Sequence, residues 1–265
     1  MARHIPAPLY FEQQGRTGMA MAFMHSTPDD LRIWMYQTAH FSPWYRCIAI
    51  DAAGYGRSPA PLPGVTLADQ AEAHWEAIDQ VSTGPVILHG NSMGSAIAEI
   101  MAVQRPERTA ALILSGTGFS TSMREIQERW KKRYTDEGIA LRNHQVLDHF
   151  TDRMKADPFV RHYAGMVDEL NSLSTLQSII AMNEALADAD LSPAFLGRIR
   201  CPTLIITGTL DRSHPGVAPL ARHIKGAEVR HMEGAGHANH FEMPWEYDRH
   251  CIEFLRRLEL FPGPP

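Results

Sequence analysis

The stretch "LHGNSMGSAIAEI" (residues 88–100) decides how the chain folds. It continues an apolar run at residues 86–88, places two glycines around Ser92, and goes on with a helical pattern of apolar residues. The spacing of Gly90, Ser92 and Gly94 is typical of a sharp strand-to-helix turn that exposes a serine, because small residues stand where larger ones would collide. Glycine and serine also favour ordinary turns, so this motif alone leaves both interpretations open.

Short apolar runs alternate with longer helical segments along the chain. Their near-continuous hydrophobicity is typical of strands that are covered on both faces. Alternation of such runs with helices predicts βαβ units and a mostly parallel sheet. The runs lie at residues 19–24, 46–51, 85–89, 110–115, 203–207 and 227–232.

Three helices have clear start signals. Thr66 and Asp69 form a capping box before the helical pattern of residues 66–81. Asp157 followed by Pro158 predicts another helix start, and Pro244 opens the last helix.

Residues 121–196 contain helical patterns and no strand-like run. We expect this segment to form a helical cap over the carboxyl edge of the sheet. The chain would then be a single domain over residues 1–265, since 265 residues are enough for one large core.

The composition excludes several classes of partner. The formal net charge is -5, from 25 basic and 30 acidic residues mixed along the chain, which argues against nucleic acid. There is no run of 18 apolar residues, and "MARHIPAPLYFEQQ" lacks the apolar centre of a signal peptide. We therefore expect a soluble cytoplasmic protein with a small-molecule substrate and no membrane partner. The sequence leaves the oligomeric state open.

The cysteines and histidines give no sign of a disulfide framework or a metal site. Three cysteines without a C-x-x-C motif suit a reducing compartment. The 14 histidines include no H-E-x-x-H pattern, and the pair His237 and His240 lacks a third ligand. We expect no metal.

A nucleophilic serine needs a histidine base and a carboxylate that fixes the tautomer of that base. In a parallel sheet both must arrive on loops at the carboxyl ends of strands. Asp211 follows the run at 203–207, and His237 follows the run at 227–232 in a glycine-rich loop. The order Ser92, Asp211, His237 is that of α/β-hydrolases.

Three other histidines compete with His237 for the role of base. His231 lies within a predicted strand, which indicates a structural role, and His240 lies one helical turn beyond His237, which predicts a pocket or surface position. His89, at the end of the strand before the serine, is predicted to be a hydrogen-bonded core residue.

Acyl transfer also needs donors for the oxyanion. One is predicted to be the backbone N–H of Met93, the residue after the nucleophile. The other must come from Ser26 or Thr27 in the loop after the first run, because Pro28 has no N–H. We favour Thr27.

Three further segments carry a resemblance to the α/β-hydrolase superfamily over nearly the full chain. "IDAAGYGRS" (50–58) resembles the D-x-x-G-x-G-x-S loop, "RIRCPTLIITGTLD" (198–211) the run into the acid, and "GAGHANHFEMPWEY" (234–247) the histidine loop. The resemblance implies the α/β-hydrolase fold: a mostly parallel central sheet flanked by helices, with a helical cap inserted after the sixth strand.

Two subfamilies are suggested within it. "HSTPDDLRIW" (25–34) is similar to a region of 3-oxoadipate enol-lactonases, while G-N-S-M-G resembles the elbow of hydrolases that split the carbon-carbon bond of ring meta-cleavage products. The latter group has a Trp where this chain has Ala238. The resemblance implies an esterase or lactonase without a cofactor. A carbon-carbon hydrolase is the first alternative, and a non-catalytic ligand-binding member of the fold is the second.

Several side chains are candidates for the substrate pocket, although each is also compatible with a purely structural place. Asn91 and Ser26 neighbour the predicted catalytic groups in sequence, and the others are large apolar residues of the first loop and the cap. The candidates are Ser26, Trp34, Asn91, Trp130, Tyr163 and Met166.

Overall fold

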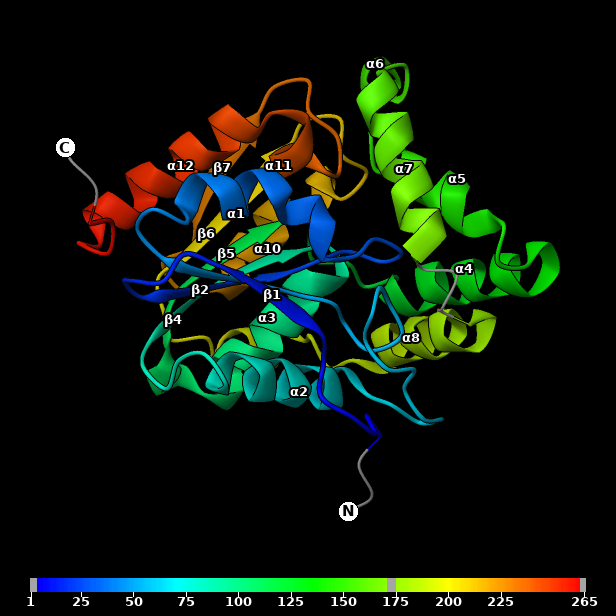
Figure 1. Ribbon diagram of the computed structural model, residues 1–265, viewed down its shortest axis with the longest axis horizontal. Coiled ribbons are helices and arrows are strands. Elements are labelled where there is room, and N and C mark those ends of the chain that lie inside the picture. The colour runs from blue at the N-terminus through cyan, green and yellow to red at the C-terminus, as the bar shows by residue number, and fades with distance from the viewer. Residues whose placement is uncertain (1–3, 171–174, 263–265) are drawn as a thin grey trace.

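The computed structural model describes residues 4–170 and 175–262, and a seven-stranded sheet runs through the centre of this part of the chain (Figure 1). The strand order is β1-β3-β2-β4-β5-β6-β7; β1 is antiparallel to β3, and the other pairs are parallel. All six predicted runs are strands, whereas β1 was not predicted. The strands are β1 Phe11–Gln14, β2 Ala20–Met24, β3 Arg46–Ile50, β4 Val86–Asn91, β5 Thr109–Ser115, β6 Thr203–Gly208 and β7 Glu228–Met232.

Helices cover both faces of this sheet. In Figure 1, α2 and α3 lie below the strands, and α1 and α12 lie above them. The apolar residues of α10 share a core with those of α2 and α3, so α10 covers the lower face. These helices are α1 Met35–Phe41, α2 Leu67–Asp79, α3 Met93–Gln104, α10 Val217–His223 and α12 Pro244–Arg257, with α11 Asn239–Glu242 and the short 3-10 helices η1 Leu31–Trp34, η2 Pro106–Arg108 and η4 His214–Gly216.

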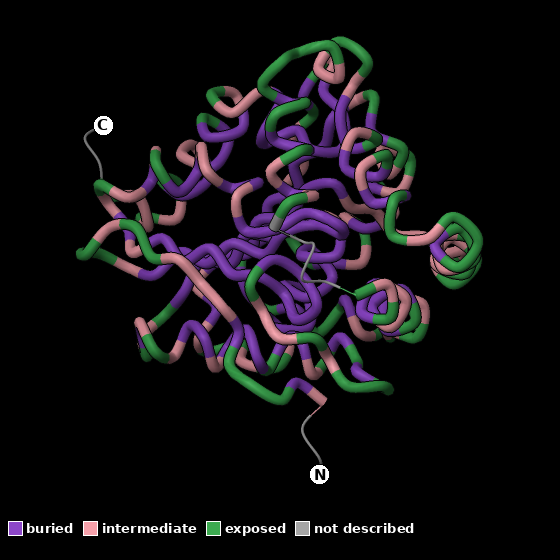
Figure 2. The backbone as a smooth tube through the Cα atoms, turned by 45° about the vertical axis from the view of Figure 1, so that its right-hand side comes forward, coloured by how far each residue is buried: buried purple, intermediate pink, exposed green. Residues whose placement is uncertain are grey.

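The strand β2 shows why the apolar runs are nearly continuous. Met21 and Phe23 belong to the core between the sheet and the helices α1 and α12. Ala20, Ala22 and Met24 belong to the core between the sheet and the helices α2 and α3. Each of the two side-chain sets is buried, so no position of the strand is left for a polar residue. Figure 2 shows the same pattern as a buried interior through the middle of the molecule.

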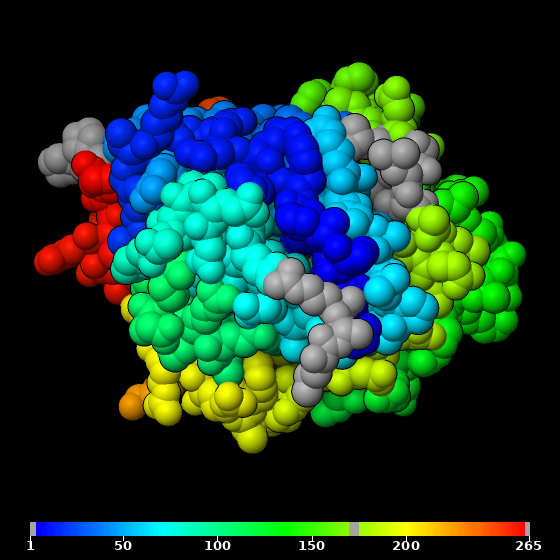
Figure 3. Space-filling model, turned by 60° about the horizontal axis from the view of Figure 1, so that its bottom comes forward, coloured from blue at the N-terminus to red at the C-terminus, as the bar shows by residue number. Residues whose placement is uncertain are grey.

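A group of helices over residues 123–196 stands between β5 and β6, and we call these residues the cap. The cap gathers at one end of the molecule in Figure 3, and α4 packs along α8. The prediction that the cap follows the sixth strand is wrong, since it follows the fifth. The described residues form five strands before the cap, of which three precede β4. Its helices are α4 Met123–Glu137, α5 Leu141–Leu147, α6 Asp152–Lys155, α7 Pro158–Leu170, α8 Leu176–Asp188 and α9 Pro193–Leu196.

The predicted helix starts are present. Thr66 accepts a hydrogen bond from the backbone N–H of Asp69 at 3.1 Å, and the Asp69 carboxylate accepts one from the backbone N–H of Thr66 at 2.9 Å. Asp157 accepts a hydrogen bond from a backbone N–H of the first turn of α7, which begins at Pro158. The last long helix begins at Pro244.

Two expectations about composition have structural counterparts. All three cysteines are buried free thiols. Within residues 4–170 and 175–262, no helix combines the length and the apolar character that crossing a membrane requires.

Candidate active site

Ser92 is the single residue between β4, which ends at Asn91, and α3, which begins at Met93. Its φ of 54° and ψ of -114° lie outside the regions that L-residues prefer, so the surrounding structure holds this backbone under strain. A Cβ at Gly90 would lie 2.4 Å from the carbonyl oxygen of Gly94, and a Cβ at Gly94 would lie 2.1 Å from that of Met24. The predicted strand-to-helix turn is therefore present, and the packing shows why both flanking positions are glycine.

The structure brings Asp211 and His237 together. Asp211 follows β6 and His237 follows β7, and His237 Nδ1 lies 2.9 Å from Asp211 Oδ1. Both side chains are buried. An ionised carboxylate only accepts hydrogen bonds, so Nδ1 carries a proton, and in the neutral form of the ring Nε2 carries the lone pair.

A serine that was not predicted holds Asp211 in place. The backbone N–H of Ser213 donates to Asp211 Oδ1 at 2.9 Å, and Ser213 Oγ donates to Asp211 Oδ2 at 2.6 Å. Burial raises the pKa of Asp211, but the His237 imidazole and the hydrogen bonds from His237 and Ser213 outweigh it and hold that pKa well below its usual range. The spacing D-x-S is typical of a turn in which an aspartate side chain binds the backbone N–H two residues later, and this spacing in the sequence could have predicted the contact.

Asn91 connects the serine corner to the histidine loop. Its Nδ2 donates to the backbone carbonyl of His237 at 3.1 Å and to Ser115 Oγ at 3.0 Å. The residue next to Ser92 is thus bonded to the backbone of His237. His237 Nε2 is buried and has no hydrogen-bond partner among the described residues, so the Ser92 hydroxyl does not bond to it here. Such bonds often tighten only when substrate is present.

The predicted oxyanion donors lie at the start of α3 and on the loop after β2. Met93 is the first residue of α3, and the N–H at this position has no acceptor within its own helix. Thr27 Oγ1 lies 2.6 Å from the hydroxyl of Tyr55, and Ser26 Oγ donates to Asp29. Since both side chains are engaged, the backbone N–H groups of Ser26 and Thr27 stay the two candidates for the second oxyanion donor.

A buried polar cluster around Asp29 was not predicted from the sequence. The Asp29 carboxylate accepts hydrogen bonds from Ser26 Oγ, from His149 Nδ1 at 2.8 Å and from the Tyr163 hydroxyl at 2.9 Å. Burial raises the pKa of Asp29, but His149 and the three hydrogen bonds more than offset this and lower it. The His149 ring centre lies 4.9 Å from that of His237, so a cap residue contacts the catalytic candidate.

Glu242 fastens the cap to the histidine loop. Its Oε1 accepts from the backbone N–H of Thr151 at 2.6 Å, and its Oε2 accepts from the backbone N–H of Gly236 at 3.1 Å. The backbone N–H of Ala238 donates to the carbonyl of His149 at 2.9 Å. Two of these hydrogen bonds join the cap to the segment that carries His237, and the third holds Glu242 against the loop before that histidine.

The predicted pocket residues lie in different surroundings. Trp34 is fully buried and stacks on His240, with ring centres 4.1 Å apart. Trp130 is half-buried on α4, with the Arg212 guanidinium 5.8 Å from its ring centre, and Met166 is half-buried on α7. The other three belong to the networks described above: Ser26, Asn91 and Tyr163.

The surroundings of the three competing histidines do not suit a catalytic base. His89 is a core residue, but both of its ring nitrogens lack a hydrogen-bond partner among the described residues, and burial lowers its pKa to about 3. His231 is exposed on β7. The expectation that His240 lies at a pocket or surface is wrong: it is fully buried between Trp34 and Tyr247, and burial lowers its pKa to about 3.

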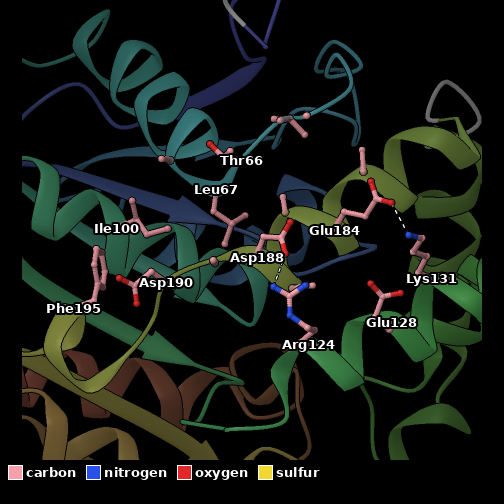
Figure 4. Close-up of a pocket in the computed structure, with 17 residues that line it drawn as sticks. Thr66, Leu67, Ile100, Arg124, Glu128, Lys131, Glu184, Asp188, Asp190 and Phe195 are labelled. Atoms are coloured by element: carbon pink, nitrogen blue, oxygen red, sulfur yellow. Dashed lines mark ion pairs between the residues drawn. The ribbon is translucent and has the colours of Figure 1, made fainter.

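A separate cavity of about 520 Å³ lies between the cap and the helices α2 and α3 (Figure 4). Its lining includes Thr66, Ile100 and Phe195, and the ion pair Arg124–Asp188 at 2.7 Å stands within it. It shares no lining residue with the group around Ser92. In the part of the chain that the structure describes, no group of three or more His, Cys, Asp or Glu side chains could hold a metal ion.

Known proteins resemble this chain over most of its length. It is 24% identical over 244 residues to 3-oxoadipate enol-lactonase 2 of Acinetobacter baylyi, covering 90% of this chain and 88% of that one. It is 25% identical over 270 residues to a 2-hydroxy-6-oxononadienedioate/2-hydroxy-6-oxononatrienedioate hydrolase of Burkholderia vietnamiensis, covering 94% and 91%. It is also 26% identical over 254 residues to a dihydrolipoyllysine-residue acetyltransferase component of an acetoin cleaving system from Pseudomonas putida; the match covers 94% of this chain but only 66% of that relative's length.

The fold has close counterparts among solved structures. The enol-lactonase from Burkholderia xenovorans LB400 superposes with a TM-score of 0.82 at 23% identity, covering 94% of this chain and 96% of that one. A likeness at this identity concerns the fold, and it agrees with the seven-stranded, mostly parallel sheet described above. The model of the alpha/beta hydrolase family matches residues 22–247, which is most of the chain. The chain therefore belongs to the alpha/beta hydrolase family.

Proposed function

We propose that this enzyme is a serine hydrolase that cleaves a small carboxylic ester or lactone through an acyl-enzyme. The observation that carries the proposal is the buried pair of His237 Nδ1 and Asp211 Oδ1 at 2.9 Å. The backbone carbonyl of that histidine is hydrogen-bonded to Asn91, which directly precedes the strained Ser92. These contacts support an arrangement in which Ser92 is the nucleophile, His237 the base and Asp211 the acid that orients the base.

In the first half of the reaction, Ser92 Oγ attacks the carbonyl carbon while His237 Nε2 takes its proton. The carbonyl oxygen becomes an oxyanion that accepts hydrogen bonds from the backbone N–H groups of Met93 and of Thr27 or Ser26. When the carbon-oxygen bond of the ester breaks, the imidazolium returns the proton to the leaving alkoxide. The acyl group is then bound to Ser92.

In the second half, water replaces the leaving group. His237 Nε2 removes a proton from the water as its oxygen attacks the acyl carbon, and the same proton returns to Ser92 Oγ when the carboxylic acid leaves. Asp211 stays ionised throughout, in keeping with its lowered pKa, and stabilises the imidazolium of each half-reaction.

The choice of ester or lactone hydrolysis rests on a similar protein and on the chemical identity of the proposed nucleophile. The 3-oxoadipate enol-lactonase of Acinetobacter baylyi is similar over 90% of the chain. The serine at position 92 disfavours haloalkane dehalogenases and epoxide hydrolases, which attack with a carboxylate. We place the enzyme in the cytoplasm as part of the same proposal, because its three cysteines are free thiols.

The direct test is hydrolysis of short 4-nitrophenyl esters and enol-lactones by wild-type enzyme and three variants. We expect Ser92→Ala and His237→Ala each to lower kcat by on the order of 10³-fold or more, and Asp211→Asn somewhat less. A fluorophosphonate probe should label Ser92 in wild-type enzyme and not in Ser92→Ala. Near-full activity of Asp211→Asn would require another acid, and absence of labelling would favour a non-catalytic ligand-binding protein.

Carbon-carbon hydrolysis is the second candidate. The G-N-S-M-G elbow and the Burkholderia vietnamiensis relative favour it, and the same three residues would serve a diketone acid. A coloured ring-cleavage product offered beside aryl esters and enol-lactones separates the two reactions. A strong preference for the ring-cleavage product, measured as kcat/KM, would overturn the ester proposal.

A further inference from the structure

A second histidine-carboxylate pair lies beside the first. His149 Nδ1 lies 2.8 Å from Asp29 Oδ2, and neither side chain is exposed to solvent. The pair joins the loop after β2 to the cap, while Tyr163 of α7 binds the other oxygen of the Asp29 carboxylate at 2.9 Å. None of these contacts takes part in the reaction outlined above.

The hydrogen bonds around Asp29 fix the state of His149. Asp29 receives donors from Ser26 and Tyr163 as well as from the histidine, as an ionised carboxylate does. His149 must therefore hold its proton on Nδ1. Burial lowers the pKa of His149, although the Asp29 charge acts in the opposite direction, so the ring is neutral. Its Nε2 is then a lone-pair acceptor.

That acceptor has no partner within the described residues. His149 Nε2 is buried without a hydrogen bond, although a buried polar atom left unpaired is destabilising. Most such atoms in folded proteins are paired. An unpaired acceptor on a ring that Asp29 orients through Nδ1 is free to accept a hydrogen bond from a ligand.

The surroundings of His149 place that ligand in the active site. Its Nδ1 lies 3.5 Å from Ser26 Oγ, on the loop that offers the second oxyanion donor. On the other side, its ring centre lies 4.9 Å from that of His237. His149 thus lies between the loop that offers the oxyanion donor and the proposed base, and both of these act at the reacting carbonyl group in the proposed reaction.

We propose that His149 is a substrate-binding residue whose Nε2 accepts a hydrogen bond from a hydroxyl or N–H group that the substrate carries next to its scissile carbonyl. This proposal rests on the proposed ester or lactone hydrolysis and names the substrate class of that site. A carboxylate at the same place would face both the Nε2 lone pair and the Asp29 charge behind it. The site therefore favours a neutral hydrogen-bond donor over an acid.

Binding without turnover tests the proposal. In the Ser92→Ala background, isothermal titration calorimetry compares 4-nitrophenyl 2-hydroxybutyrate, as separate enantiomers, with 4-nitrophenyl butyrate and 4-nitrophenyl hydrogen malonate. We expect one hydroxy enantiomer to bind about tenfold or more tightly than the butyrate ester, because a site built around a hydrogen bond discriminates against the analogue that lacks it. The malonate ester should bind most weakly.

Two double variants assign the preference to His149. Ser92→Ala/His149→Phe should bind the hydroxy and the plain ester equally. Ser92→Ala/His89→Phe, which changes another buried histidine without hydrogen bonds, should keep the preference. Equal binding of the two esters in Ser92→Ala, or a preference that survives His149→Phe, would overturn the proposal. So would tightest binding of the malonate ester, because that requires an imidazolium donor.

A second measurement applies if the Phe variant does not fold. In ¹⁵N-histidine-labelled Ser92→Ala, the Nε2 resonance of His149 should move with the hydroxy ester and stay with the butyrate ester; identical spectra would contradict the proposed contact. Hydrolysis of plain esters by wild-type enzyme tests the proposed function separately. Failure of catalysis and failure of this binding contact are thus distinguishable.

Discussion

Asn91 Nδ2 donates a hydrogen bond to the backbone carbonyl of His237 at 3.1 Å, across 146 residues of sequence. Because Asn91 is the last residue of β4 and Ser92 follows it, this bond joins the strand that ends at the proposed nucleophile to the loop that carries the proposed base. The same amide group is held by Ser115 Oγ on β5. One side chain therefore ties the His237 backbone to two neighbouring strands of the sheet.

Replacement of Asn91 should disturb catalysis more than binding. Asn91→Ala removes both hydrogen bonds, and we expect kcat to fall by roughly 10- to 100-fold with KM little changed, since misplacement of a catalytic group acts on the transition state. Asn91→Asp should be worse, because it sets a carboxylate oxygen against the His237 carbonyl. Steady-state kinetics on one aryl ester checks both. Equal kcat in the two variants and wild type would show that this amide does not position the base.

The low pKa of Asp211 predicts a defined dependence on acid. A carboxylate whose pKa is lower in the folded state stabilises the protein fully above its unfolded pKa near 4, and this contribution is lost as the pH falls further. Ser213→Ala removes one hydrogen bond to the ionised form, so acid unfolding should begin at a higher pH. Circular dichroism between pH 2 and pH 6 checks this. Ser42→Ala, which changes an exposed serine, should leave the acid midpoint unmoved.

Asp29 should matter more to stability than any one of its partners. Asp29→Ala leaves Ser26, His149 and Tyr163 without their common acceptor, and breaking such a buried network costs about 3–5 kcal/mol. Tyr163→Phe removes a single donor and should cost about 1–2 kcal/mol. Urea unfolding of both variants measures the difference. Equal losses would mean that Asp29 is not the centre of the network.

The burial of Glu99 predicts that one contribution to stability falls, rather than rises, as the pH increases. It is buried on α3, its Oε1 has no partner among the described residues, and burial raises its pKa to about 8. An acid whose pKa is higher in the folded state makes folding less favourable as the pH rises from about 4.5 to 8, by roughly 3 kcal/mol at pH 7. Glu99→Gln should remove this slope.

The melting temperatures of wild type and Glu99→Gln at pH 5 and pH 8 check this prediction. The advantage of the variant over wild type should grow with pH. Parallel melting temperatures at both pH values would show that Glu99 keeps its ordinary acidity in the folded protein.

The strands were predictable because their burial on both faces is visible in the sequence. The edge strand β1 was not, since Phe11–Gln14 is short, half polar and partly exposed. The proximity of Asp211 and His237 was predictable because the loops after two neighbouring parallel strands meet at one edge of the sheet. The fold and the positions of these groups thus follow from local pattern and topology.

His149 and Asp29 were not predictable, because their relationship arises only when the cap closes on the loop after β2. Neither residue stands in a local motif, and 120 residues separate them in sequence. Similarly, His240 reads as a polar residue of a catalytic loop, yet it stacks on Trp34 inside the core. Tertiary packing, not sequence pattern, decides the environment of these side chains.

The carboxylate of Glu242 has a consequence for how substrate enters. Because its two oxygens accept from the backbone N–H groups of Thr151 and Gly236, lifting the cap edge around Thr151 would leave one oxygen of this carboxylate without that donor. Opening on this side would also break the bond between the Ala238 N–H and the His149 carbonyl, so the proposed base would regain its neighbouring contacts only after reclosure. The enzyme would be least able to react with water at the moment when its site is most open to it.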